Sequence, residues 1–266
     1  MSRPPIVWLA SYPKCGNTWV RFMLSAAVFG VPERSSEVPA RIPDIHQRDR
    51  WSESEETGNI AAPYRFIKTH FKLTDAHPLL DETSRAIHII RDPRDVIHSA
   101  LNYRALTGQG QRTWTQRGYT RSFIRAGGDK HWHKVGFGSW ADNAASWRAT
   151  DRFPVLGVRY EDLKAEPAAQ LERMMSFLEI PIDAQRLGDA VEASRFESMR
   201  AMEVREKKAT QSGENGMFIG DKAAARKGLL FVNKGRSGQS LDSIGKGLDA
   251  RLTMRMGDAM RAYGYA

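Results

Sequence analysis

The chain has 266 residues, 41% of them hydrophobic and 27% charged, which suits one large globular α/β domain. Lys and Arg number 40 and Asp and Glu 31, so the net charge of +9 favours an anionic ligand. A single cysteine excludes an internal disulfide framework. Because no apolar run is long enough for a membrane span or a secretory signal, we expect a cytoplasmic protein without a membrane partner.

Alternating strands and helices predict a mainly parallel central sheet flanked by helices on both faces, in one domain over residues 1–266. Short apolar runs predict strands at 6–10, 64–68, 86–90 and 155–159. Helical spacing of apolar residues predicts helices over 18–29, 93–106, 140–150, from 167, over 182–193 and near the C-terminus.

Three connecting segments are expected to differ from these elements. Residues 31–62 contain several prolines and predict short helices at most. Residues 107–139 are Gly-rich, basic and aromatic, which predicts a long loop that covers a substrate. Residues 203–228 are highly charged and predict a mobile surface segment. In the last helix, an apolar stripe predicts core packing, although a homodimer seam would show the same pattern: Leu241, Ile244, Leu248, Leu252, Met256 and Met260.

A phosphate-binding loop is predicted where the first strand meets the first helix, in the sequence YPKCGNTW at 12–19. Such a junction turns free backbone amides and the positive end of the helix dipole toward an anion. Gly16 permits close approach, Lys14 adds charge, Thr18 adds a hydroxyl, and Asn17 is the expected N-cap. The lysine precedes the glycine, so the loop resembles a P-loop in function without the Walker A order.

The second strand ends in Lys68-Thr69-His70. Lys68 and His70 are two residues apart and share one face of the strand. The ordinary pKa of histidine lies near neutrality, which suits proton transfer, although a histidine at a strand end is more often structural.

Arg91 follows the third strand, in the sequence RDPRD. Its planar fork suits a phosphate, and Ser99 lies two turns into the next helix. Asp92 as N-cap and Pro93 at the first helical position predict the helix start. Taken alone, this segment is more typical of a capped helix with surface ion pairs.

Together these three segments resemble the sulfotransferases that use 3′-phosphoadenosine 5′-phosphosulfate (PAPS). The resemblance implies that Lys14 bridges the 5′-phosphate and the sulfuryl group, that Trp19 stacks on adenine, and that Arg91 and Ser99 hold the 3′-phosphate. It implies adenosine 3′,5′-bisphosphate (PAP) as product. The residues that it implies for the 5′-phosphate form one run: Cys15, Gly16, Asn17 and Thr18.

The resemblance also implies the catalytic residues. His70 takes the proton of the acceptor hydroxyl, Lys14 and Lys68 stabilise the transferring group, and Ser99 contacts Lys14 until the acceptor arrives. Lysines take the place of a metal, so none is expected.

Weaker similarities extend the donor site toward the C-terminus. Tyr160, in the sequence RYED, is expected near the nucleotide. Phe196 and Met199 resemble a segment around adenine. A late loop with Lys234, Gly235 and Arg236 resembles the one that closes on the 3′-phosphate, and 226–228 is a competing match.

The sequence therefore predicts sulfuryl transfer to a small hydroxylated acceptor. Within the family, the sequence resembles bacterial enzymes that sulfate glycopeptide antibiotics, and this resemblance implies a natural-product hydroxyl as the acceptor. A P-loop kinase and a basic nucleic-acid-binding module are the two alternatives, and no nucleic acid is expected as partner. Cys15, beside Lys14 at a helix N-terminus, is expected to be a reactive thiol or an inert small residue.

Overall fold

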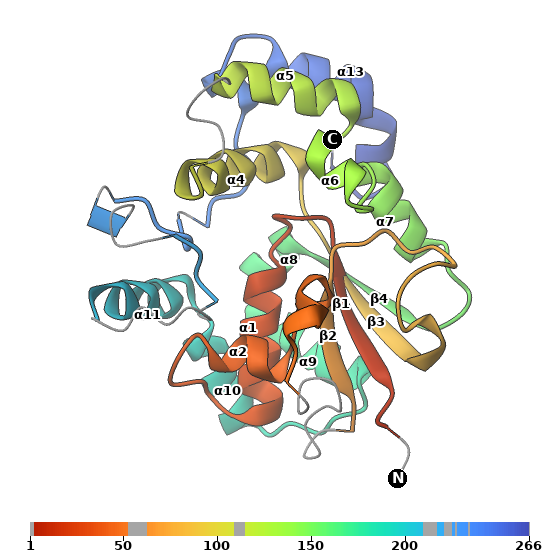
Figure 1. Cartoon of the computed structure of the whole chain (residues 1–266), viewed down its shortest axis with the longest axis vertical. Helices are drawn as coiled ribbons and strands as arrows, with labels where there is room; N and C mark the ends of the chain where they lie inside the picture. The colour runs from red at the N-terminus through yellow and green to blue at the C-terminus, as the bar shows by residue number, and fades with distance from the viewer. Residues whose placement is uncertain are drawn as a thin grey trace.

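Four parallel strands form the centre of the molecule, in the order β2-β1-β3-β4 (Figure 1). They are β1 (Ile6–Ser11), β2 (Arg65–Thr69), β3 (Thr83–Ile90) and β4 (Val155–Arg159). The predicted parallel sheet is confirmed. This computed structural model describes residues 3–52, 63–108, 115–209, 217–220, 225–226, 228–233 and 235–265.

Helices connect and cover the strands, as predicted. The helices are α1 (Asn17–Phe29), α2 (Glu37–Arg41), α4 (Pro93–Leu106), α5 (Gln116–Ala126), α6 (Lys130–Lys134), α7 (Trp140–Arg148), α8 (Tyr160–Ala165), α9 (Pro167–Phe177), α10 (Ala184–Ala193), α11 (Phe196–Lys208) and α13 (Leu248–Arg261). Short 3-10 helices lie at Ile45–Arg50, Leu80–Glu82 and Leu241–Ser243. The helix start at Asp92 is also confirmed, because its carboxylate accepts from the amide of Arg94 at 2.8 Å.

The sheet is buried on both faces, as the run of apolar residues in β1 requires. Val7 and Leu9 point into the larger core, which α1, α9 and α10 help to form. Ile6 and Trp8 point the opposite way, into a second core with Trp147 of α7. The alternation along β1 is therefore what places helices on both sides.

Two expectations about connecting segments are wrong. Residues 107–139 are not one loop, because they contain α5 and α6; only 109–114 lie outside the described residues. Helix α5 buries Tyr119, Thr120, Phe123 and Ile124 on one face, between a Thr115 N-cap and a Gly127 C-cap. The start of 203–228 is the end of α11, where Glu203 and Lys207 are buried, and residues 210–216, 221–224 and 227 lie outside the described residues.

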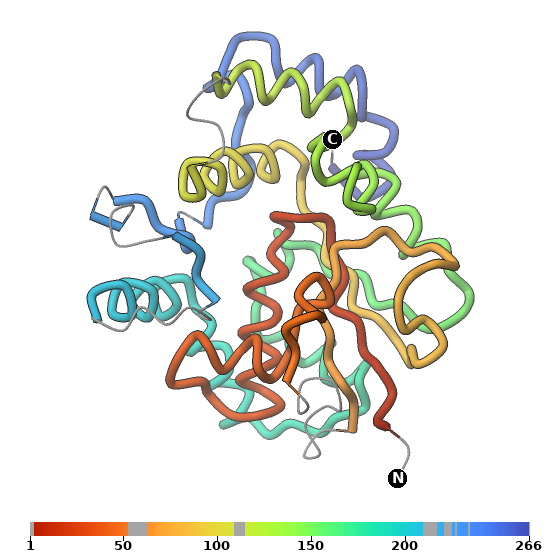
Figure 2. The backbone as a smooth tube through the Cα atoms, viewed as in Figure 1, coloured from red at the N-terminus to blue at the C-terminus, as the bar shows by residue number. Residues whose placement is uncertain are grey.

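The apolar stripe near the C-terminus belongs to the core. Leu248, Leu252, Met256 and Met260 of α13 are buried, with Leu241 just before them. The stripe is therefore not a homodimer seam. Helix α13 packs beside α5 above the sheet, and the two chain termini lie toward opposite ends of the molecule (Figure 2). Of the helices in the described ranges, none is long and apolar enough to span a membrane.

Candidate active site

The predicted site residues meet at one edge of the sheet. Because all four strands are parallel, their carboxyl ends lie together, and a site residue or loop follows each strand. The loop 12–16 follows β1, His70 follows β2, Arg91 follows β3 and Tyr160 follows β4. The chain leaves β1 for β2 on one side and then crosses to β3 on the other, so the ligand crevice is expected beside β1.

The loop after β1 has the backbone of an anion cradle. Lys14 and Gly16 are left-handed, with φ of 70° and 101°. A Cβ at Gly16 would lie 2.6 Å from Cδ2 of Tyr160, so this position requires glycine for both conformation and space. No described group accepts a hydrogen bond from the amides of Gly16, Asn17 and Thr18 at the start of α1. These donors, together with the helix dipole, favour an anion.

The Lys14 ammonium lies at the mouth of this loop. Its Nζ is 4.4 Å from the ring centroid of Tyr103 and 4.8 Å from that of Phe231, and it pairs with no described carboxylate. Burial, with the charges of Arg91 and Lys68, lowers the pKa of Lys14 to about 7. A bound anion would stabilise the charged form of this lysine.

Arg91 joins three parts of the site. Its guanidinium carbon lies 4.0 Å from the ring centroid of Tyr160. Its Nη2 donates to the carbonyl of Arg236 at 2.6 Å, and its Nη1 to the carbonyl of Lys14 at 3.3 Å. The Nε is buried without a partner among the described residues, so one donor is still available for a ligand.

Aromatic residues form the side of the site next to α1 and α11. Trp19 contacts Tyr160 edge to face, with ring centroids 5.5 Å apart, and its buried Nε1 has no described partner. A Cβ at Gly235 would lie 3.1 Å from Phe196, so the late segment passes directly over that ring. Met199 is buried in the cluster that Trp19 and Phe196 pack against.

Two buried carboxylates hold the late segment, here residues 231–239 apart from 234, in place. Asp95 of α4 accepts from the amides of Gly238 at 2.9 Å and Gln239 at 3.2 Å. Glu203 of α11, which also pairs with Lys207, accepts from the amides of Phe231 and Val232 at 2.7 and 2.8 Å.

Of the two candidate late loops, the described part of 231–239 reaches the site, through Gly235 and Arg236. Arg226 and Gly228 have no described bond to the predicted site residues. Lys234 lies outside the described residues.

His70 has a fixed tautomer. Its Nδ1 lies 2.8 Å from the carbonyl oxygen of Ser11, which only accepts, so Nδ1 carries the proton and Nε2 keeps its lone pair. Burial, with the charge of Lys68, lowers the pKa of His70 well below its usual value. The imidazole is therefore neutral at neutral pH, which is the form that a base requires.

Lys68 is held by Asp44. Its Nζ donates to Asp44 Oδ2 at 2.7 Å, and its amide donates to the carbonyl of Pro43 at 2.8 Å beside β2. Burial lowers the pKa of Lys68 to about 8, against the opposing effect of Asp44. The Lys68 and Arg21 cations hold the pKa of Asp44 well below its usual range, although burial alone would raise it.

His46, like Asp44, is a polar residue of the site that the sequence analysis did not single out. Its Nε2 accepts from the backbone amide of His70 at 3.0 Å, and the two rings stack with centroids 5.9 Å apart. Burial lowers the pKa of His46 to about 4. Asp44 is the N-cap of the 3-10 helix Ile45–Arg50, which contains His46, and no sequence motif marked either residue as part of the site.

Ser99 and Thr18 are the two hydroxyl residues that the sequence predicts for the donor site. Ser99 lies one turn before Tyr103 on α4, so both are on the face near Lys14. Neither hydroxyl has a described hydrogen-bond partner. Asn17 is not the N-cap: Gly16 takes that position, and the side-chain Nδ2 of Asn17 donates to the carbonyl of Leu9 and the hydroxyl of Ser11.

Cys15 is not a reactive thiol. Its side chain is fully buried, and burial raises its pKa to about 12. The expectation of a lowered pKa counted the adjacent lysine and the helix end but not the loss of water around the sulfur.

Comparison with known proteins gives the family. The model described as "Sulfotransferase domain" matches residues 4–238. Sulfotransferase 2B1 of Homo sapiens is 28% identical over 204 residues, which cover 73% of this chain and 52% of that protein. Sulfotransferase 1C2 of Homo sapiens is 24% identical over 210 residues, which cover 75% and 67%. The chain thus spans about half the length of the first relative and two thirds of the second.

Solved structures share the fold. Retinol dehydratase in complex with androsterone and inactive cofactor PAP has a TM-score of 0.67 at 17% identity, over 98% of this chain and 82% of that one. Mouse sulfotransferase SULT7A1 complexed with PAP has a TM-score of 0.64 at 20% identity, over 98% and 89%. Neither the kinase nor the nucleic-acid-binding alternative gains support from these comparisons. The chain belongs to the sulfotransferase family, as its three motifs predict.

Proposed function

We propose that this chain transfers the sulfuryl group of PAPS to a hydroxyl of a small-molecule acceptor, with PAP as the second product. The observation that carries the proposal is the meeting of Lys14, the free amides of the first loop, Arg91 and His70 at one sheet edge. An anionic donor and a neutral base are the two chemical requirements of such a transfer. Family membership and the PAP in the two related structures support the donor.

The donor fits the residues present. The amides of 16–18 and the hydroxyl of Thr18 would hold the 5′-phosphate, and the orphaned Nε of Arg91 would meet the 3′-phosphate together with Ser99. Trp19, Tyr160, Phe196 and Met199 supply apolar and aromatic surface for the adenine. Lys234, Gly235 and Arg236 are proposed to close the site. PAPS supplies the activated sulfuryl group.

His70 is the proposed general base. With Nδ1–H bound to the Ser11 carbonyl, the Nε2 lone pair is free to take the acceptor's proton. The side-chain Nδ2 of Asn143 donates to the carbonyl oxygens of His70 and Phe137 at 3.0 Å each, which ties the backbone of His70 to that of Phe137. The base is therefore oriented before a substrate arrives.

Lys14 and Lys68 are proposed to stabilise the charge on the transferring group and on the leaving oxygen. Asp44 keeps Lys68 charged and in place, although Lys68 is buried and would lose its proton near pH 8. Asp44 is thus a positioning residue. Ser99 is proposed to bind the Lys14 ammonium until the acceptor is present.

The acceptor is proposed to lie against the rings around His70. Phe137 and His46 lie 5.6 and 5.9 Å from the His70 ring, and Phe71 packs on both. An apolar, aromatic surface suits a natural-product hydroxyl, with α5, α6 and the residues up to 139 covering it. A cytoplasmic location belongs to the same proposal, because the single cysteine suits a reducing compartment.

The test is incubation of the full chain with labelled PAPS and a panel of phenols, sugars and hydroxylated peptides. We expect transfer of label with formation of PAP, and transfer that is slower by roughly a hundredfold or more for His70→Ala under the same conditions. Binding of PAP without transfer to any acceptor would leave a nucleotide-binding protein and contradict the proposed activity. Equal stabilisation by magnesium-ATP and by PAP would return the kinase alternative.

A further inference from the structure

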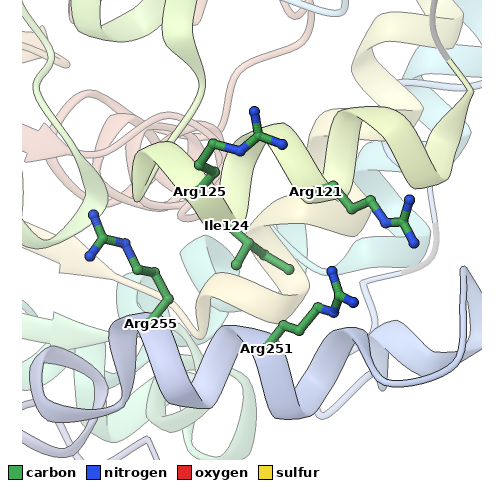
Figure 3. Close-up of a pocket in the computed structure, with 5 residues that line it drawn as sticks. All are labelled: Arg121, Ile124, Arg125, Arg251 and Arg255. Carbon is green, nitrogen blue, oxygen red and sulfur yellow. The ribbon is translucent and has the colours of Figure 1, made fainter.

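A cleft lined by arginines lies between α5 and α13, outside the candidate active site. It has a volume of about 510 Å³ and is lined by Arg121, Ile124, Arg125, Arg251 and Arg255 (Figure 3). Helix α5 supplies the first three residues and α13 the other two. Below we call it the arginine cleft.

Among the described residues, none of the four guanidinium groups pairs with a carboxylate or a carbonyl. All four arginines are exposed. Exposed arginines elsewhere do pair, as Arg195 does with Glu192 at 3.0 Å.

The spacing of the arginines adds a cost. Arg121 and Arg125 are four residues apart on α5, and Arg251 and Arg255 are four apart on α13, so each helix has a repulsive pair. Packing the two helices together adds a second repulsion. A ligand that neutralises both pairs would remove these costs.

The cleft also has an apolar part. Ile124 lies between the arginines and is 6% exposed, so it forms a floor. Met254, which is 88% exposed, lies three residues after Arg251 and so on the same side of α13 as that arginine. A bound molecule would thus contact hydrocarbon between two charged ends.

We infer that the arginine cleft binds a small oligoanion, a molecule with two or more phosphate or sulfate groups. Planar guanidinium groups bind such groups through paired hydrogen bonds, and two pairs of arginines suit two anionic groups. The volume admits a molecule of that size and excludes a single small ion as the full occupant.

This site is separate from the donor site. The opposite face of α5 contacts the first loop, where the rings of Phe123 and Tyr12 have centroids 6.3 Å apart. The width of one helix, about 10 Å, therefore separates the two. The inference does not rest on the proposed transfer reaction.

Calorimetric titration of the full chain, first saturated with PAP so that the donor site is blocked, tests this. The probes are tripolyphosphate and a disaccharide with two sulfate groups, with orthophosphate as the single-anion control. We expect one binding site per chain for at least one probe, much weaker binding of orthophosphate, and loss of affinity as salt rises. The relative affinity of the two probes shows whether the cleft prefers phosphate or sulfate groups.

Two double variants with the same change of charge decide the location. Arg121→Ala with Arg251→Ala should weaken binding at least tenfold, with the PAP affinity and the melting temperature unchanged. Arg152→Ala with Arg173→Ala, which removes exposed arginines on other elements, should change it less than twofold. Three results would overturn the inference: no binding to PAP-saturated protein, competition between the probe and PAP, or equal loss in both double variants.

Discussion

The guanidinium of Arg91 stacks on Tyr160 at 4.0 Å, so the residue after β3 is oriented by the residue after β4. Tyr160→Ala should weaken PAP binding roughly tenfold, because a desolvated stack of this kind contributes about 1–2 kcal/mol. Tyr160→Phe keeps the ring and should bind PAP nearly as well as the wild type. Calorimetry with PAP measures both. If the phenylalanine variant is as weak as the alanine variant, the phenol hydroxyl and not the stack is what matters.

His70 and Lys14 are assigned different roles, so their loss should differ. His70→Ala should keep its donor affinity and lose roughly a hundredfold or more in turnover, the usual scale for a missing base. Lys14→Ala should lose both, because the ammonium meets the donor before and during transfer. Donor titrations beside single-turnover rates separate the two. Normal turnover with weakened donor binding in His70→Ala would make His70 a nucleotide contact.

Donor binding should depend on pH through Lys14. Its pKa is lowered to about 7 in the free protein, and the anionic donor prefers the charged lysine. Affinity should therefore be full below pH 7 and fall as pH rises above it, by up to tenfold per unit, with a proton taken up on binding. Lys14→Arg stays charged and should lose this dependence. Calorimetry in buffers of different ionisation enthalpy measures the uptake; a flat wild-type profile would contradict the assignment.

Turnover should tolerate acid to a lower pH than an ordinary histidine base would allow. The pKa of His70 lies well below its usual value, so its neutral form persists as pH falls through 6.5. Turnover at saturating donor should show no loss near pH 6.5 and decline only at lower pH. A midpoint near 6.5 would indicate that the base is a histidine in contact with water.

Asp44→Asn should change the basic side of the turnover profile. Without the carboxylate, the pKa of Lys68 falls further below about 8. The loss of turnover with rising pH should therefore begin at a lower pH than in the wild type. PAP affinity should change less than turnover. Asp49→Asn, a surface change beside Arg50, is the matched control. A uniform loss at every pH, with no shift of the profile, would give Asp44 a purely structural role.

The buried Glu203 should be required for stability and for the late segment. Glu203→Gln leaves the Lys207 ammonium buried without its partner, so we expect a loss of about 3–5 kcal/mol in the free energy of unfolding. PAP affinity should fall as well, because the amides of Phe231 and Val232 lose one of their two acceptor oxygens. Urea unfolding measures the first effect. Asp258→Asn, at an exposed ion pair, should stay within about 0.5 kcal/mol, and equal effects would refute the argument.

The sequence was informative wherever chemistry and local structure coincide. The first loop, Lys68-Thr69-His70 and the Arg91 turn each follow a strand within a few residues, so their pattern predicts their position at the carboxyl edge. Asp44 and His46 gave no such signal. They reach Lys68 and His70 from the start of the 3-10 helix Ile45–Arg50, where an isolated bridge joins Asp44 to Lys68.

Tertiary surroundings explain the other errors. Helix α5 has a buried face, but Arg117, Arg121 and Arg125 recur on its other faces and Gly118 lowers its helix propensity. The pKa of the Cys15 thiol is set mainly by its burial and not by the residues beside it in the sequence. From the sequence, Glu203 is expected to be a surface charge, but in the structure two backbone amides of the late segment donate hydrogen bonds to it.

The contact of Arg91 with the carbonyl of Arg236 has a consequence for biosynthesis. The loop after β1 is translated before the other three strands, whereas the segment that completes the site is made only after all four. A nascent chain, or one truncated before Arg236, would therefore lack a finished nucleotide pocket, even with its sheet assembled. Nucleotide binding would thus report that both the sheet and the late segment have folded.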